Sequence, residues 1–67
     1  MNTISKTAAK KLGFVSLTQP YIAKEMKLLE RTVDSLARRG RKHVLVEITK
    51  RPMQVEVWVE QSSFKKT

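Results

Sequence analysis

Residues 43–60, HVLVEITKRPMQVEVWVE, contain the pattern that decides the fold. Apolar and polar side chains alternate on both sides of a central turn, and most of the apolar ones are β-branched, which is typical of two half-buried strands. Because proline cannot continue a central strand, residues 49–52 are predicted as the turn. With Thr49 opposite Pro52, the cross-strand pairs are Val44–Val57 and Val46–Val55. Both rows of valines then lie on one face, so the sequence predicts a β-hairpin with a valine core.

Three other hairpin residues have roles that this register leaves open. Leu45 and Trp58 point away from the valine face, where residues 14–17 or an N-terminal helix cover them, or where they form an exposed patch that recruits a partner. An exposed Trp58 could also stack on an unpaired base. His43, the only histidine, is expected opposite Trp58 as a packing residue, because one imidazole cannot form a metal site without further ligands.

Upstream of the hairpin, the chain predicts two short elements. Segment 3–12 is predicted as a helix, because apolar residues recur in it at four-residue intervals and Gly13 is well placed to end it. The recurring residues are Ile4, Ala8 and Leu12. Residues 14–17 are predicted as a short extended segment.

Residues 18–39 are predicted as helical, with Gly40 ending the segment. Thr18 suits the N-cap position, and Pro20 suits the first turn, where its missing N–H is harmless. The apolar stripe of this segment consists of Ile22, Met26, Leu29, Val33 and Leu36. Two alternatives remain: one long helix, or a helix-turn-helix with its turn at residues 27–30. The whole pattern predicts an α+β domain that ends in the hairpin.

The size and composition of the chain limit the classes of protein that it can belong to. Its 67 residues and 7.7 kDa suffice for one small domain with a thin core, expected over residues 1–60, with a frayed basic tail over residues 61–67. Because cysteine is absent, no disulfide or thiolate metal site can form, which fits a cytoplasmic protein. No apolar run exceeds three residues, and the first six residues lack the apolar stretch of a signal peptide, so we expect no membrane span and no leader.

The basic residues give the strongest functional signal. Fourteen Lys and Arg against six Asp and Glu give a formal net charge of +8, a large excess for so small a surface, which favours a polyanionic partner. The candidate nucleic-acid-binding residues are Lys24, Lys27, Arg31, Ser35, Arg38, Arg39, Arg41, Lys42, Lys50 and Arg51. Guanidinium and ammonium groups placed along one helix face and at a hairpin tip can contact successive phosphates of a nucleic acid and release its condensed counterions. The alternative is a solvated helix face on which Asp34 pairs with Arg31 and Arg38.

The helical segment also resembles a known DNA-binding motif. Residues 17–26, LTQPYIAKEM, with Leu28, Thr32-Val33 and Leu36-Ala37, resemble the helix-turn-helix of the winged-helix DNA-binding family. In that family a small residue, here Ala23, lets the second helix pack across the first, and a buried aliphatic residue, here Val33, anchors the recognition helix. The sequence departs from the pattern at Lys27, where the turn commonly has glycine, and at Leu29, where the next helix commonly has a polar cap.

The resemblance implies a way of binding. Residues 43–60 would form the wing, and the second helix of the motif would enter the major groove. Arg31, Ser35 and Arg38 would then contact base edges or phosphates, while the wing tip reaches an adjacent groove. Small basic winged-helix proteins of this size resemble the excisionases and repressors of phages and mobile elements.

The chain lacks any pattern typical of catalysis: it has no nucleophile–base set, no glycine-rich phosphate loop and no facing carboxylates. We therefore expect a non-enzyme without cofactor or metal. The predicted function is binding of double-stranded DNA by a small transcriptional regulator or a recombination or architectural factor of phage or mobile-element type. The alternatives are an inhibitor or adaptor that binds an acidic protein, and a protein that binds RNA or single strands. A homodimer also remains open.

Overall fold

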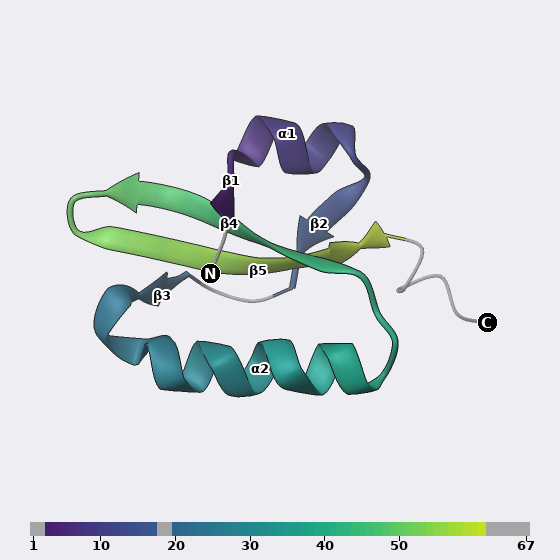
Figure 1. The fold of residues 1–67 in the computed structure, drawn as a ribbon. Helices are drawn as coiled ribbons and strands as arrows, with labels where there is room; N and C mark the ends of the chain where they lie inside the picture. Colours follow the sequence, from purple (N-terminus) through teal and green to yellow (C-terminus); the bar gives the residue numbers. More distant parts are fainter. Residues whose placement is uncertain (1–2, 18–19, 62–67) are drawn as a thin grey trace.

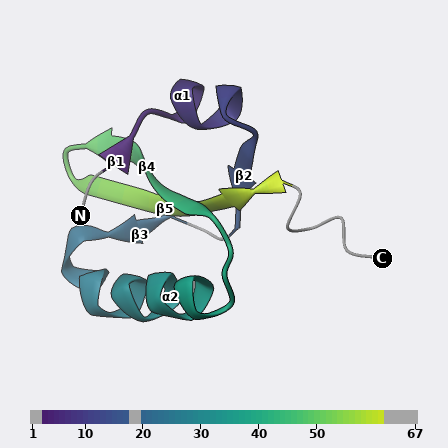
Figure 2. The ribbon, with the colours of Figure 1, turned by 45° about the vertical axis from the view of Figure 1, so that its right-hand side comes forward.

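The computed structural model describes residues 3–17 and 20–61, which form a mixed α+β domain of three layers (Figure 1). A β-sheet lies in the middle, helix α1 covers one face, and helix α2 covers the other, as a second view confirms (Figure 2). The elements are β1 (Thr3–Ile4), α1 (Lys6–Lys11), β2 (Phe14–Ser16), β3 (Tyr21–Ile22), the 3₁₀ helix η1 (Ala23–Glu25), α2 (Met26–Arg38), β4 (His43–Lys50) and β5 (Met53–Glu60). The predicted α+β class is confirmed.

The predicted hairpin is present as β4 and β5, and it forms the centre of the sheet. The strand order is β1-β4-β5-β2, and β3 pairs with β5 as well. The two-residue strand β1 runs parallel to β4, whereas β2 and β3 follow one another along the far side of β5, both antiparallel to it. The β5 edge of the hairpin is therefore paired along most of its length and the β4 edge only at Leu45 and Val46, and the tip extends away from the rest of the sheet (Figure 1).

The predicted register of the hairpin is wrong by two residues beside the turn, where Thr49 lies opposite Gln54 and not Pro52, and by one residue further along the strands. Val44 lies opposite Trp58 and Val46 opposite Glu56, in place of the predicted valine pairs. The turn consists of residues 51–52, because Lys50 pairs with Met53 and leaves the proline outside the ladder, where its missing N–H costs no strand bond. An irregularity between Glu47 and Thr49 shifts the register once more, so counting back from the turn cannot give the pairing of the central residues.

This shift changes which residues share a face, because a slip of one residue turns every side chain of a strand to the other side. On the α2 side, Leu45 joins the core with three valines of β5: Val55, Val57 and Val59. On the α1 side, Val46 and Trp58 pack with Ala9 of the helix. The sheet therefore has two thin cores rather than one valine core.

The expectations for the three open hairpin residues are resolved in the same way. Trp58 is 3% exposed and packs with Ala9, so the prediction that the N-terminal helix covers it is confirmed. The two alternatives for Trp58, an exposed patch that recruits a partner and a surface on which a base stacks, are wrong. Leu45 is also buried, but on the α2 side. His43 lies opposite Val59 and not opposite Trp58, and its Nδ1 lies 3.2 Å from the carbonyl oxygen of Arg41.

Helix α1 is shorter than the predicted helix over residues 3–12, because Thr3 and Ile4, the first residues of the predicted segment, pair with β4 as strand β1. The hydroxyl of Ser5 accepts a hydrogen bond of 3.1 Å from the backbone N–H of Ala8, so it caps the helix. Gly13 ends the helix with φ +84°, a left-handed conformation that glycine adopts without strain, and this prediction is confirmed. The short strand predicted at residues 14–17 is confirmed over Phe14–Ser16.

The helix predicted over residues 18–39 starts later than expected. Thr18 lies outside the described residues, and Pro20 precedes a strand rather than a helix. Tyr21 and Ile22 are residues that favour strands, and they pair with the outer side of β5, which competes with local helix formation. Gly40 ends α2 with φ +69°, as predicted.

The described residues do not contain the helix-turn-helix arrangement. Helix α2 is continuous through residues 27–30, so no turn interrupts it there, and η1 is a single 3₁₀ segment where the motif needs its first helix. Leu29, at the position of the expected polar cap, is instead fully buried against the sheet, which explains why the helix continues through it. Val33 packs, partly buried, on the same core. The side chain of Ala23 lies outside what the structure describes.

Candidate nucleic-acid interface

The inner face of α2 fixes how the helix is oriented. Leu29 is 0% exposed and Leu36 is 5% exposed, and both pack on the valines of β5. These leucines lie seven residues apart, so they mark one line along the helix, and Met26 and Val33 complete the apolar face beside it. Because this face is held by the core, the opposite face of α2 points to solvent over the whole helix.

The outer face of α2 presents the basic residues predicted from the sequence. The residues on its outermost line are Lys27, Arg31, Ser35 and Arg38, all exposed. Their spacing of four, four and three residues keeps them on one stripe, on the side of the helix away from Leu29 and Leu36. We call these four residues the α2 stripe.

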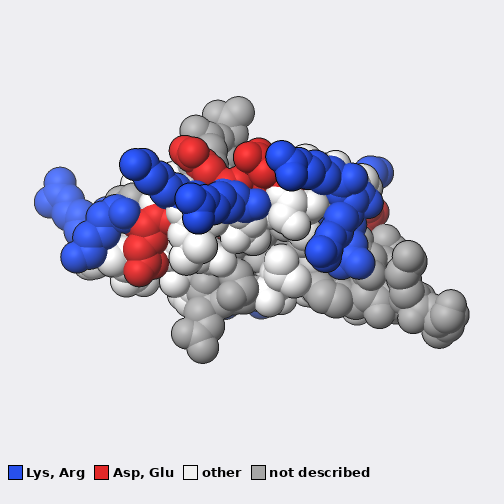
Figure 3. Space-filling model, turned by 90° about the horizontal axis from the view of Figure 1, so that it is seen from below, with Lys and Arg blue, Asp and Glu red and all other residues white. Residues whose placement is uncertain are grey.

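Two acidic residues accompany the α2 stripe. Glu30 lies to one side of it, whereas Asp34 lies among its residues, three positions after Arg31 and four before Arg38. The space-filling view of this face has Lys and Arg side chains spread along it, with Asp and Glu side chains between and beside them (Figure 3). The stripe therefore carries a positive excess that Asp34 reduces locally.

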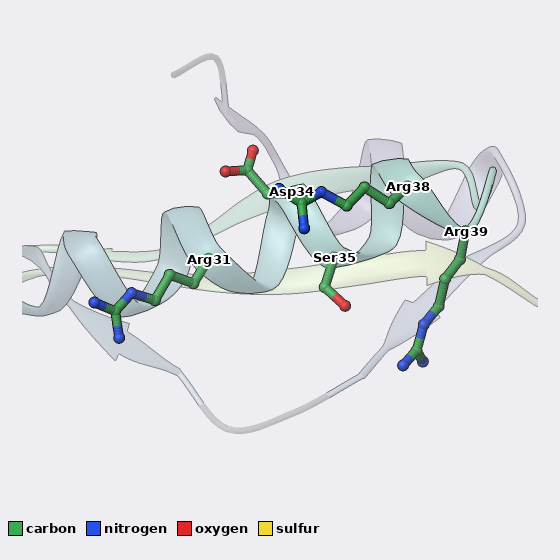
Figure 4. A pocket seen from close by; sticks show the side chains of 5 residues that line it. All are labelled: Arg31, Asp34, Ser35, Arg38 and Arg39. Atoms are coloured by element: carbon green, nitrogen blue, oxygen red, sulfur yellow. The ribbon is translucent and has the colours of Figure 1, made fainter.

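A shallow hollow of about 310 Å³ opens on the C-terminal half of the stripe. Its lining residues are Arg31, Asp34, Ser35, Arg38 and Arg39. Arg31 and Arg39 stand at the two ends of the hollow, Ser35 lies between them, and Arg38 points back toward Asp34 (Figure 4). Within the described residues, the structure records no ion pair between Asp34 and Arg31 or Arg38, so the guanidinium donors are available to an anion.

The basic run after the stripe is arranged by the end of α2. Arg38 lies in the last helical turn, where a cation also interacts favourably with the helix dipole. Gly40 then reverses the chain, which leaves Arg39 and Lys42 exposed and Arg41 partly buried. The run therefore continues the α2 stripe from the helix into the start of β4.

The hairpin tip lies at the other end of the stripe. Lys50 and Arg51 are exposed at the tip, and Pro52 and Met53 of the tip line a second hollow together with Ile22 and Lys24. The tip of β4 and β5 and the start of α2 are on the same side of the molecule in both ribbon views (Figures 1 and 2). Residues that are far apart in sequence are thus neighbours at this end.

The ten candidate residues lie at the hairpin tip, in η1, along the α2 stripe and in the run that ends at Lys42, and we call them together the basic track. Three other lysines do not belong to it. Lys6, Lys10 and Lys11 are exposed on or beside α1, on the opposite side of the sheet. The apolar lining beside Lys24 was not predicted, because it depends on the pairing of β3 with β5 and no local signal marks it.

The chain was also compared with known proteins. Family models, curated proteins and solved structures yield no match to it. In the described part of the chain, no helix is long and apolar enough to cross a membrane. No three His, Asp or Glu side chains among the described residues gather into a group that could hold a metal ion.

Proposed function

We propose that this protein binds double-stranded DNA through the basic track. The observation that carries the proposal is the α2 stripe: a helix held on the sheet by Leu29 and Leu36 presents cations at regular spacing along its exposed side. Packing fixes the helix backbone before binding, so only the side chains of its cations need ordering when they contact phosphates. A frayed or loosely held segment would lose that advantage.

The dimensions of α2 suit a duplex. Its 13 residues span about 20 Å at 1.5 Å per residue, and the major groove of B-DNA admits a single α-helix. In this pose Arg31, Ser35 and Arg38 face base edges or phosphates. The runs at the two ends, Arg39–Lys42 and Lys50–Arg51, then contact the flanking backbone, where each neutralised phosphate adds about 0.9 to the slope of log affinity against log salt.

The role that goes with this binding is that of a small regulator or an architectural or recombination factor, of the kind phages and mobile elements encode. This part of the proposal rests on the size of the domain, its net charge of +8 and the absence of a catalytic pattern in the sequence. It does not depend on a helix-turn-helix, since one packed helix with a basic outer face is sufficient to contact a groove. We propose a cytoplasmic location for it, which fits a chain without cysteine.

The test is a mobility shift with duplex DNA, single-stranded DNA and RNA of the same sequence, at two salt concentrations. We expect the duplex to bind most tightly and its affinity to fall steeply with salt. Absence of duplex binding at low salt would overturn the proposal, and tighter binding of RNA or of the single strand would assign the track to that ligand instead. A polyglutamate competitor that displaces the duplex at an equal concentration of charges would favour an acidic protein partner.

Two triple variants with the same net charge make the test specific to α2. The first removes three charges from the stripe, as Lys27→Ala, Arg31→Ala and Arg38→Ala. The matched control removes three charges from the α1 side, as Lys6→Ala, Lys10→Ala and Lys11→Ala. We expect the stripe variant to lose at least tenfold more affinity for the duplex than the control, because only the stripe variant removes cations that contact phosphates. Equal losses would mean diffuse attraction without a binding helix.

A further inference from the structure

The hollow at the hairpin tip differs from the rest of the track because its surface is apolar. It encloses about 410 Å³, and its walls are Ile22, Pro52, Met53 and the aliphatic stem of Lys24. Met53 is 44% exposed although it is a large hydrophobic residue next to a turn, where polar residues are the usual choice. The apolar surface is therefore presented to solvent at the far end of the hairpin.

Strand pairing and a hydrogen bond across the turn hold Pro52 and Met53 in place. Lys50 pairs with Met53 and closes a turn of two residues. The hydroxyl of Thr49 donates a hydrogen bond of 2.6 Å to the carbonyl oxygen of Pro52, across the turn. Behind the tip, β5 enters the core at Val55, which is 2% exposed. Pro52 and Met53 thus sit at the end of an anchored ribbon.

Three cations lie at the tip and around its hollow. Lys50 and Arg51 directly precede Pro52 and Met53, and Lys24 lies across the hollow. Residues 49–54 contain no acidic side chain. An apolar tip with cations beside it matches a ligand that has an apolar interior and anionic edges, which is the composition of a DNA duplex, where stacked bases lie between two rows of phosphates. An apolar patch on a protein partner would leave these three cations without counter-charges.

We infer that the hairpin tip enters the minor groove and that Met53, supported by Pro52, inserts as a wedge between two base pairs and bends the duplex. This inference rests on the proposed function and extends it, because it names the groove and the deformation. Methionine and proline are among the apolar residues that minor-groove proteins insert at base steps, with kinks of about 20–90°. The unbranched thioether of Met53 adapts to the irregular gap of a partly unstacked step. Lys50 and Arg51 contact the phosphates on either side.

The bend also explains how two ends of one small domain reach the same duplex. A kink at the tip turns the flanking DNA, and the track from Lys24 along the α2 stripe then follows the adjoining phosphates. The contacts made along α2 offset the cost of unstacking the step at the tip. Flexible pyrimidine–purine steps such as TA are accordingly the favoured positions for insertion.

The experiment measures bending and unstacking separately from binding. One short duplex has a fluorescence energy-transfer pair at its ends, and a second has a fluorescent base analogue at a central TA step. The variants are Met53→Gln, which keeps the length of the side chain but makes it polar, and Met53→Leu, which keeps it apolar. Leu12→Gln is the matched control, because Leu12 is 63% exposed on the α1 side.

We expect the wild-type protein to raise both the energy transfer and the emission of the base analogue. Met53→Gln should lose both signals at saturating protein, with an affinity reduced several-fold, whereas Met53→Leu and Leu12→Gln should keep them. Binding of the wild-type protein without bending or unstacking would overturn the inference and leave the proposed function intact. Absence of duplex binding by the wild-type protein would overturn both. If Met53→Gln abolishes self-association in sedimentation and leaves bending unchanged, the tip binds a second copy, and the inference is wrong.

Discussion

The backbone N–H of Arg41 donates a hydrogen bond of 3.1 Å to the carbonyl oxygen of Leu36, five residues earlier in the chain. A second bond of 3.0 Å joins the N–H of Gly40 to the carbonyl oxygen of Ala37. Together these bonds form a Schellman motif, which ends α2 and turns the chain toward β4. Leu36 is also a core residue of α2, so the same residue anchors the helix and fixes the direction in which the basic run leaves it.

Replacement of Gly40 should therefore weaken both the fold and the binding site. Gly40 has φ +69°, and an added Cβ would meet no atom within 4 Å, so the cost of Gly40→Ala is backbone strain alone. We expect a loss of about 1 kcal/mol in the free energy of unfolding, measured by urea denaturation. Gly40→Asn should lose less, since asparagine tolerates the left-handed conformation better. Equal stability of the alanine variant and the wild type would contradict this account of the helix end.

Removal of the negative charge of Asp34 should strengthen the binding of DNA. Asp34 lines the same hollow as Arg31 and Arg38, and a phosphate that approaches these arginines is repelled by its carboxylate. Asp34→Asn should raise the affinity for duplex DNA roughly two- to threefold at low salt, since an exposed charge contributes about 0.5 kcal/mol. Fluorescence anisotropy with a labelled duplex measures the change. At high salt the gain should vanish by screening, and a gain that persists there would show a different cause.

The two cations of the hairpin tip should affect binding without affecting the fold. Lys50 and Arg51 are exposed, and the turn is held by strand pairing and by the hydrogen bond between Thr49 and Pro52. The double variant Lys50→Ala/Arg51→Ala should keep its stability within about 0.5 kcal/mol. Its affinity should fall on every duplex sequence, and the logarithmic salt slope should shrink by roughly two units. An unchanged slope would show that the tip does not touch DNA, and a loss confined to one sequence would show that it reads bases.

Features that depend on neighbours in sequence were predictable from this chain. The ends of both helices follow from Gly13 and Gly40, because only a left-handed residue satisfies the last carbonyl groups in this way. The alternation in residues 43–60 is equally local, and it predicts the hairpin. The basic candidates follow from charge and helical spacing, and the helix that presents three of them extends over Met26–Arg38.

Features that depend on distant partners were not predictable. The register of the hairpin depends on the irregularity between Glu47 and Thr49, which no sequence signal marks. Ile22 continues the apolar stripe of the helical segment, yet Tyr21 and Ile22 become a strand because β5 offers them an edge. The neighbourhood of Lys24 and Pro52 follows from that same pairing, so the apolar hollow at the tip could not be inferred before the fold was known.

Trp58, the only tryptophan, allows a direct test of which side of the sheet meets nucleic acid. It packs with Ala9 and Val46 on the α1 side, and its indole N–H donates a hydrogen bond of 2.8 Å to a carboxylate oxygen of Glu56. Because the basic track lies on the other side, saturation with duplex DNA should leave the wavelength of Trp58 emission unchanged and its intensity nearly so. Denaturation in urea should shift the emission to the red as the indole is exposed. A titration of free N-acetyltryptophanamide with the same DNA corrects for absorbed light. Strong quenching of Trp58 by single-stranded DNA, beyond that correction, would show that bases stack on the indole and that the α1 side opens on binding.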